Sequence, residues 1–196
     1  MKRDRALQAF IDDVELVVRT TDDEHEITER LAERLSALLT GGYRLPPELT
    51  RPAADHHVNY PLHIAPDSGW SLAAVVWSPG QRTPVHGHET WGVVGIYAGA
   101  EREFRYVKPA ADDSGPLTPA GEQVWERDEV TVCCTTDDDV HSVAAVSDTP
   151  TVGIHLYGAD IGAIQRRRYD PATGAVEWFV SGWDTPPTGF TRYAAE

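Results

Sequence analysis

The sequence contains few cysteines, and the two that it has are neighbours, Cys133 and Cys134. Adjacent cysteines rarely bridge, because the geometry of such a disulfide is strained. A disulfide framework of the kind found in small secreted proteins is therefore excluded, and we expect a cytoplasmic protein.

Basic residues are also scarce. Lysine and arginine number 17 against 31 aspartates and glutamates, which gives a net charge of −14. Binding to phosphates requires a basic face, so we expect neither nucleic acid nor an anionic membrane surface as a partner. The acidity indicates solubility. Its densest run, Asp137 to Asp139, is expected to be a solvated turn and not a calcium loop.

Long apolar runs are missing as well, since none approaches the roughly 20 residues needed to span a bilayer. Near the N-terminus Asp12, Asp13 and Glu15 interrupt the apolar stretch, so we expect no signal peptide. What is present is typical of a packed globule: 41% hydrophobic residues and six tryptophans. A length of 196 residues suits one domain, and we expect a single domain over 1–196.

The first forty residues predict two helices, because their apolar positions repeat at helical spacing. Asp22 or Asp23 is suited to cap the second helix, and Gly41 and Gly42 to end it. We expect residues 1–42 to form a helical extension packed on the rest, because so short a segment makes a poor core of its own. The repeating positions are Leu7, Phe10, Ile11, Val14 and Val18, then Ile27, Leu31, Leu35 and Leu38.

From Ser71 onward the sequence changes to short runs rich in valine, tyrosine and tryptophan, separated by glycine, proline and aspartate. Many short strands at this spacing indicate a mainly β sandwich or barrel. The strands are expected near Ser71–Ser78, Trp91–Ala98, Glu103–Val107, Val130–Cys134, Ser142–Val146, Val152–Tyr157 and Glu177–Val180.

Three histidines form a candidate metal site. His86 and His88 are two residues apart, so on a strand their side chains share one face, and His141 opens a later strand. Gly80 and Gly99 flank the histidine pair. Imidazole suits iron, copper, zinc and nickel. The pattern therefore predicts a metal held by His86, His88 and His141.

No carboxylate is expected to join this site. The inward position where one would stand holds Gly92, and Glu89 points to the opposite face from the histidine pair. Three neutral ligands leave the full charge of the cation, which favours an anionic ligand such as a thiolate. Three other histidines lie in helical or loop sequence and are expected to be solvated: His25, His56 and His57. The setting of His63 stays open.

Gly153, His155 and Tyr157 also share one strand face. A buried His beside a buried Tyr can form a hydrogen-bonded couple that acts on a ligand, although a half-buried strand with two amphipathic side chains fits too. Just beyond lies the triplet Arg166 to Arg168. We expect one arginine to face the mouth of the barrel, where it could bind a carboxylate, and the others to face solvent. Salt bridges to the acidic surface are the alternative.

Two stretches resemble the bacterial thiol dioxygenases of the cupin superfamily, in particular 3-mercaptopropionate dioxygenase, a relative of cysteine dioxygenase. The stretch 77–88 (WSPGQRTPVHGH) is similar to the first metal motif of that family, and 91–95 (WGVVG) continues it. The stretch 154–163 (IHLYGADIGA) is similar to the second signature. The resemblance runs from the N-terminal helices to about Trp183.

This resemblance implies a cupin double-stranded β-helix, or jelly-roll barrel. It implies Fe(II) on His86, His88 and His141, and a Ser-His-Tyr triad of which His155 and Tyr157 are present. It also implies that Arg166 anchors the carboxylate of the substrate.

The sequence departs from the family pattern at three positions. Gly153 replaces the serine of the triad, and Gly92 stands where some relatives carry a cysteine that crosslinks to the tyrosine. The early-strand arginine that holds the carboxylate in cysteine dioxygenases is absent, and Leu62 falls near its position. The last departure favours a mercaptopropionate-like binding mode.

The function that the resemblance implies is oxidation of a small carboxylated thiol, 3-mercaptopropionate or cysteine, to its sulfinate by dioxygen. One alternative is a specialised biosynthetic oxygenase that acts on cysteine or another small thiol and gives a different product. Another is a non-catalytic metal-binding cupin that serves as a sensor, because this fold hosts many functions.

Overall fold

A computed structural model describes residues 4–67, 69–109, 115–137 and 139–185. It confirms the two expected helices, α1 (Arg5–Thr20) and α2 (Glu24–Thr40). The cap of α2 is Asp23 and not Asp22, since the Asp23 carboxylate accepts a hydrogen bond from the backbone N–H of Glu26 at 2.9 Å. Helix α2 ends at Gly41, and a short 3₁₀ helix, η1 (Pro47–Thr50), follows.

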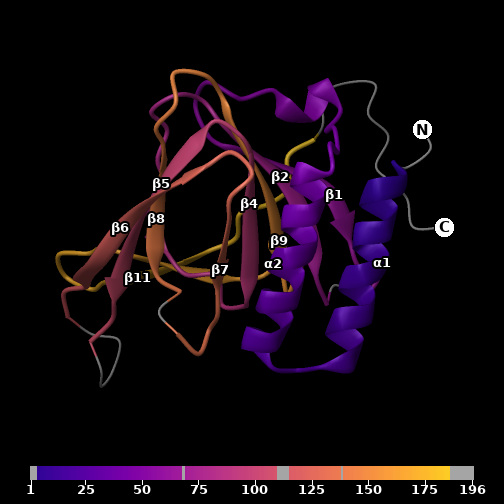
Figure 1. Ribbon diagram of the computed structural model, residues 1–196. Coiled ribbons are helices and arrows are strands. Elements are labelled where there is room, and N and C mark those ends of the chain that lie inside the picture. Colours follow the sequence, from indigo (N-terminus) through magenta and orange to yellow (C-terminus); the bar gives the residue numbers. More distant parts are fainter. Residues whose placement is uncertain (1–3, 68, 110–114, 138, 186–196) are drawn as a thin grey trace.

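The strands of the described residues form two antiparallel sheets (Figure 1). One sheet has five strands in the order β1-β2-β9-β4-β7, and the other has six in the order β11-β10-β3-β8-β5-β6. The strands are β1 (Val58–Ile64), β2 (Ser71–Trp77), β3 (Val85–His86), β4 (Gly92–Ala98), β5 (Ala100–Val107), β6 (Thr118–Glu126), β7 (Val130–Cys133), β8 (His141–Ala145), β9 (Thr151–Tyr157), β10 (Arg166–Tyr169) and β11 (Val176–Phe179).

The chain crosses between the two sheets at almost every step. From β2 to β10 successive strands alternate between the five-stranded and the six-stranded sheet, apart from the hairpin of β5 and β6. A chain that winds in this way forms a jelly roll, the double-stranded β-helix of the cupins. The predicted fold class, a mainly β cupin barrel with two N-terminal helices, is confirmed. Strands β1, β6 and β10 were not predicted, and β3 ends at His86, before His88, which was expected on the same strand.

The outer face of the five-stranded sheet packs against the two helices. Leu72, Val76 and Ile154 face outward and pack in one core with both helices, which lie against this side of the barrel in Figure 1. On β4 a Cβ atom at Gly95 would lie only 2.7 Å from Leu39 Cδ1, so glycine lets α2 approach the sheet. The alternate positions of these strands point into the barrel.

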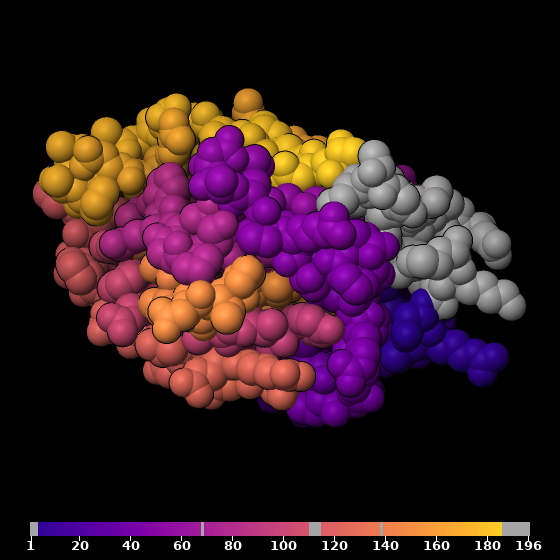
Figure 2. Space-filling view, turned by 90° about the horizontal axis from the view of Figure 1, so that it is seen from above, coloured from indigo at the N-terminus to yellow at the C-terminus, as the bar shows by residue number. Residues whose placement is uncertain are grey.

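The C-terminal part of the described chain crosses one end of the barrel. In Figure 2 it is the yellow segment beside the purple segment before β1. Asp184 holds the two together, because its carboxylate accepts from the backbone N–H of Asn59 at 2.7 Å. Neither helix in the described part of the chain is long and apolar enough to cross a membrane.

Candidate metal centre

The three predicted histidines lie together at one end of the barrel. His86 on β3 stands directly opposite His141 on β8, and His88 joins them from the loop after β3. The ligand nitrogens that the three rings offer all lie within 4.8 Å of one another. Strand β3 ends at His86, so His88 is held by the loop and not by the strand that we expected. The Asp139 carboxylate fixes this loop by accepting from the backbone N–H of His88 at 2.9 Å.

Asp139 thereby departs from the expected solvated turn. It is only partly exposed, whereas Asp137 is exposed as expected, and Asp138 lies outside the described residues. Burial raises the pKa of the Asp139 carboxyl, and the hydrogen bond from His88 opposes that shift. The acidic run therefore shapes the loop that carries a candidate ligand.

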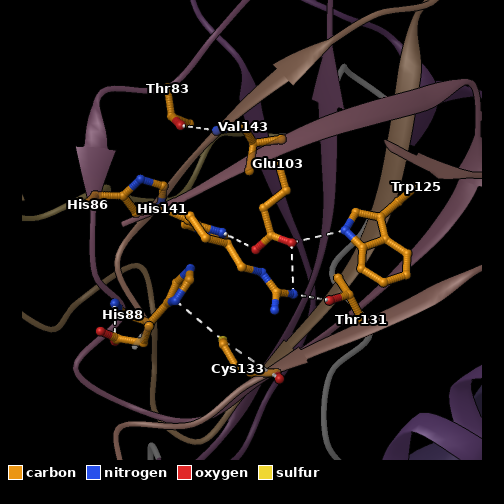
Figure 3. A network of polar contacts seen from close by, with 12 residues as sticks. Thr83, His86, His88, Glu103, Trp125, Thr131, Cys133, His141 and Val143 are labelled. Carbon is orange, nitrogen blue, oxygen red and sulfur yellow. Dashed lines mark hydrogen bonds and ion pairs between the residues drawn. The ribbon is translucent and has the colours of Figure 1, made fainter. Parts of the chain in front are cut away.

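Each of the three rings has its Nδ1 engaged by the protein, and Figure 3 shows these contacts for His88 and His141. The contacts of Nδ1 are the Pro84 carbonyl oxygen at 3.0 Å for His86, the Cys133 Sγ at 3.4 Å for His88 and the Glu103 Oε1 at 2.7 Å for His141. A ring that donates from Nδ1 keeps the lone pair of Nε2 for a metal. Burial also holds the pKa values of His86 and His88 well below the usual range. A cluster of three imidazoles with anchored outer nitrogens fits a divalent transition metal.

Glu103 on β5 is the strongest support of the cluster, and it was not among the predicted site residues. Besides His141, its carboxylate accepts from Trp125 Nε1 and Arg105 Nη2, both at 3.0 Å (Figure 3). Burial alone would raise the pKa of Glu103, but the hydrogen bond with His141 and the other donors lower it to about 2. A carboxylate behind a ligating histidine orients the ring and makes it a better ligand. No local pattern in the sequence marks Glu103, because glutamates on an exposed strand face can alternate in the same way.

His155 and Tyr157 face the same interior from β9. The expected couple is present, because His155 Nδ1 lies 2.9 Å from the Tyr157 hydroxyl. The Tyr157 ring also lies beside His88, with 5.3 Å between ring centroids. Burial lowers the pKa of His155 to about 3 and raises that of Tyr157, so the imidazole is neutral and the phenol protonated.

Arg166 is the arginine of the triplet that faces the interior. It is buried, and its guanidinium donates to the Gly87 carbonyl oxygen at 3.4 Å and to the Ser181 hydroxyl. The guanidinium also lies 4.8 Å from the centroid of the Phe179 ring. The loop between the histidine ligands and the C-terminal segment thus hold Arg166 in place.

The other two arginines form ion pairs. Arg167 pairs with both carboxylate oxygens of Glu89, at 2.8 and 3.0 Å. This pair turns Glu89 away from the metal cluster, as expected, but it leaves Arg167 partly buried and not solvated. Arg168 pairs with Glu177 at 2.6 Å on the exposed surface.

All six predicted site residues line one cavity of about 60 Å³. His57, Trp77, Glu101 and Glu103 line it as well. A larger outer pocket of about 430 Å³ shares His57, His86 and Arg166 with it and opens it to solvent. The size of the inner cavity suits a small substrate.

The expectation that His57 is solvated is wrong. Its ring stacks on Trp77 with centroids 4.5 Å apart, and burial lowers its pKa to about 4. His56 is exposed, as expected, and contacts Asp55 at 2.8 Å. His25 is exposed as well.

Two of the departures from the family pattern, Gly92 and Leu62, lie in different parts of the barrel. A Cβ atom at Gly92 would lie 2.8 Å from Cys133 Sγ and 3.2 Å from the ring of Tyr157, so Cys133 fills the space beside this glycine. Leu62 is buried among the residues that pack with the helices, away from the cavity. Cys133 and Cys134 are free thiols.

No model of a known protein family matches the sequence. Several solved structures are similar. A protein from Thermus thermophilus is 16% identical, with a TM-score of 0.44 over 60% of this chain and 96% of that chain. A cupin superfamily protein from Desulfitobacterium hafniense is 10% identical, with a TM-score of 0.42 over 61% of this chain and 93% of that chain. An oxalate oxidase, in complex with the substrate analogue glycolate, is 18% identical, with a TM-score of 0.44 over 61% of this chain and 62% of that chain.

Proposed function

We propose that this protein is an Fe(II)-dependent thiol dioxygenase that converts a small carboxylated thiol, 3-mercaptopropionate or cysteine, to its sulfinate. The observation that carries the proposal is one small cavity that joins a cluster of three imidazoles to a buried arginine. The resemblance of stretches 77–88 and 154–163 to the thiol dioxygenases supports the same reaction.

The donor set of the cluster favours a thiolate as a further ligand. His86, His88 and His141 would hold the iron, and all three are neutral ligands, so the cation keeps its charge. When bound, the iron supplies the redox chemistry, and the protein supplies position and electrostatics. The three Nδ1 contacts hold the rings in one tautomer, which keeps the site ready for the metal.

Arg166 would bind the other end of the substrate. Its guanidinium is buried beside His86 and Gly87, so its positive charge is little screened. A planar guanidinium pairs with a carboxylate through two parallel hydrogen bonds. Fixing both ends of a three-carbon thiol orients its sulfur at the cluster. The cavity shares His57, His86 and Arg166 with the outer pocket of about 430 Å³, which adds room for a substrate of that size.

Tyr157 would act beside the sulfur. Its protonated hydroxyl lies in the cavity close to His88, and His155 holds it. The hydroxyl can therefore donate a hydrogen bond to oxygen or to the substrate during the reaction. The reaction adds both atoms of dioxygen to the sulfur: two S–O bonds form and the O–O bond breaks. No further reductant is needed.

The test is oxygen consumption by iron-loaded protein with 3-mercaptopropionate, cysteine and cysteamine, each in turn. We expect the carboxylated thiols to consume one dioxygen per thiol, and mass spectrometry after reaction under ¹⁸O₂ to find two labelled oxygens in the sulfinate. Iron-loaded protein that oxidises no thiol would favour a non-catalytic metal-binding cupin. A product other than the sulfinate would favour a specialised oxygenase.

A further inference from the structure

Gly153 lies on β9, two residues before His155, which lines the cavity. A Cβ atom at position 153 would lie 2.4 Å from His155 Nε2 and 3.4 Å from Glu101 Oε1. The first distance is far shorter than a van der Waals contact, so the imidazole lies where any larger side chain would begin. Glycine therefore lets the His155 ring approach β9 closely, and Nε2 and the Glu101 carboxyl face the same space.

Both of these polar atoms are buried. His155 is 6% exposed and Glu101 is 3% exposed. Within the described part of the chain, neither His155 Nε2 nor Glu101 Oε1 has a hydrogen-bond partner. Buried polar atoms are almost always satisfied by protein or by an ordered water. A donor and an acceptor that border one space can satisfy each other.

We propose that Glu101 is a positioning residue that acts through His155. Its carboxyl group binds Nε2 of His155, directly or through one water, and so decides which ring nitrogen carries the proton. His155 then sets the direction of the Tyr157 hydroxyl. The inference deepens the proposed function, on which it rests only for the role of Tyr157 toward the substrate.

The chain of hydrogen bonds from Glu101 through His155 to Tyr157, here called the relay, has two states, because neutral imidazole carries one proton. When Glu101 is protonated, it donates to Nε2, and the proton of His155 lies on Nδ1. Nδ1–H then donates to the Tyr157 oxygen, and the tyrosine O–H is free to donate into the cavity. When Glu101 is ionised, it accepts from Nε2–H. Nδ1 then accepts from the tyrosine O–H, and the cavity meets an oxygen lone pair.

The surroundings of Glu101 make both states accessible near neutral pH. Burial raises the pKa of Glu101 to about 7, the nearby Trp77 indole opposes the shift, and the negative charge of Glu103 adds to it. His155 and Tyr157 are the titratable groups that face Glu101 from β9. From β8 the residue paired with Glu101 is the apolar Ala145.

The test reads the tautomer of His155 without substrate or oxygen, so it is independent of whether the protein oxidises thiols. Zinc-loaded protein with ¹⁵N-labelled histidine rings is titrated by NMR, and the His155 signals are assigned by their loss in His155→Phe. We expect the two ring nitrogens of His155 to exchange protonated and unprotonated shifts with a midpoint near pH 7, the pKa of Glu101.

In Glu101→Gln this exchange should disappear between about pH 5.5 and 8.5, because an amide does not titrate. Glu103→Gln is the matched control on the same strand. It should keep the exchange and move its midpoint to lower pH, since it removes a negative charge that raises the pKa of Glu101. An unchanged exchange in Glu101→Gln, or its absence from the wild-type protein, would overturn the proposal.

Gly153→Ser gives a second measurement that does not depend on one variant. The serine would displace the ring, because its Cβ would lie 2.4 Å from Nε2, and its hydroxyl would replace Glu101 as the partner of Nε2. Glu101→Gln should then leave the His155 shifts unchanged in the Gly153→Ser background. An effect of equal size in both backgrounds would contradict a relay through this space.

Discussion

The two buried glutamates of the cavity differ in how completely they are partnered. Glu103 accepts hydrogen bonds from His141, Trp125 and Arg105. Glu101 is buried as well, but its Oε1 has no hydrogen-bond partner among the described residues. The two glutamates are two residues apart on β5 and share a face, yet the pKa of one is lowered and that of the other is raised.

This contrast indicates different tasks. A fully partnered group is rigid, and rigidity is what a ligand of a metal needs from its support. A buried carboxyl with an unpartnered oxygen and a pKa near 7 can change its protonation state near neutral pH. This suits a group that directs a proton. The following experiments test whether Glu103 supports a metal site and whether Glu101 acts on the proton of His155.

Replacing a single histidine of the cluster should have the largest effect. His141→Ala leaves two neutral nitrogens, which hold ferrous iron poorly against water, so we expect the purified protein to lose nearly all bound iron. His86→Ala and His88→Ala should do the same. Elemental analysis measures the iron content, and His56→Ala on the exposed surface is the control. Wild-type iron in all three variants would contradict the site.

Glu101→Gln should change how stability depends on pH. The folded-state pKa of about 7 lies above the ordinary value of 4.5, so the folded state binds more protons than the unfolded state between these values. Stability from this group is thus present below about pH 4.5 and is lost as the pH rises to about 7. Relative to the wild type, the variant should gain roughly 2 to 3 kcal/mol in free energy of unfolding between pH 5 and pH 8.

Urea denaturation of both proteins at the two pH values measures this difference. The same stability difference between variant and wild type at pH 5 and pH 8 would show that Glu101 does not titrate in this range.

Glu103→Gln should weaken metal binding roughly 10- to 100-fold, because it removes the charge behind His141. Glu101→Gln is the matched control, since it changes the same residue type on the same strand but contacts no candidate ligand. Competition with a chelator measures the affinity of both variants for zinc. If the two variants lost equal affinity, the support of His141 by Glu103 would be of no special importance.

Arg166→Lys should impair carboxylated thiols selectively. Lysine keeps the charge but loses the planar fork, and a bidentate pair in a partly dry cavity contributes roughly 1.5 to 3 kcal/mol. We expect KM for 3-mercaptopropionate to rise on the order of tenfold or more.

Cysteamine, which has no carboxylate, should be affected little. Arg168→Lys on the exposed surface is the control. Equal losses for both thiols in Arg166→Lys would refute the anchoring role.

Tyr157→Phe should have the smallest of these effects. It removes one hydrogen bond, worth roughly 1 kcal/mol, so kcat should fall roughly two- to tenfold while the iron content stays the same. Steady-state oxygen consumption together with iron analysis measures both. An unchanged kcat would mean that the couple with His155 is structural only.

The elements that the sequence predicted share one property: their pattern is local. The helices have apolar residues at helical spacing and an aspartate cap, and both were found. The missed strands lack such a pattern. Strand β1 contains Pro61, β6 is largely exposed and polar, and β10 consists of arginines and one tyrosine. Each is a strand because it pairs with another, β1 with β2, β6 with β5, and β10 with β3 and β11, so pairing and not composition makes them strands.

The candidate site divides along the same line. Six of its residues lie in or near sequence motifs, which is why the sequence alone indicates them: His86, His88, His141, His155, Tyr157 and Arg166. Glu101, Glu103 and His57 line the cavity, and Cys133 contacts His88, all from strands and loops without a motif. No local pattern distinguishes a glutamate behind a ligand from one on the surface, because side chains of both kinds alternate along a strand.

Spacing along the chain was therefore enough to predict the fold class, the two helices and the residue types of a three-histidine site. How those residues are supported depends on contacts made in the folded protein. Folding places β5 beside β8, so that Glu103 contacts His141. It also places Gly153 on β9 close to Glu101, so that His155 Nε2 and the Glu101 carboxyl border one space. Both glutamates are buried, and their pKa values differ because their partners differ. Those partners depend on the packing of strands that lie far apart in the sequence.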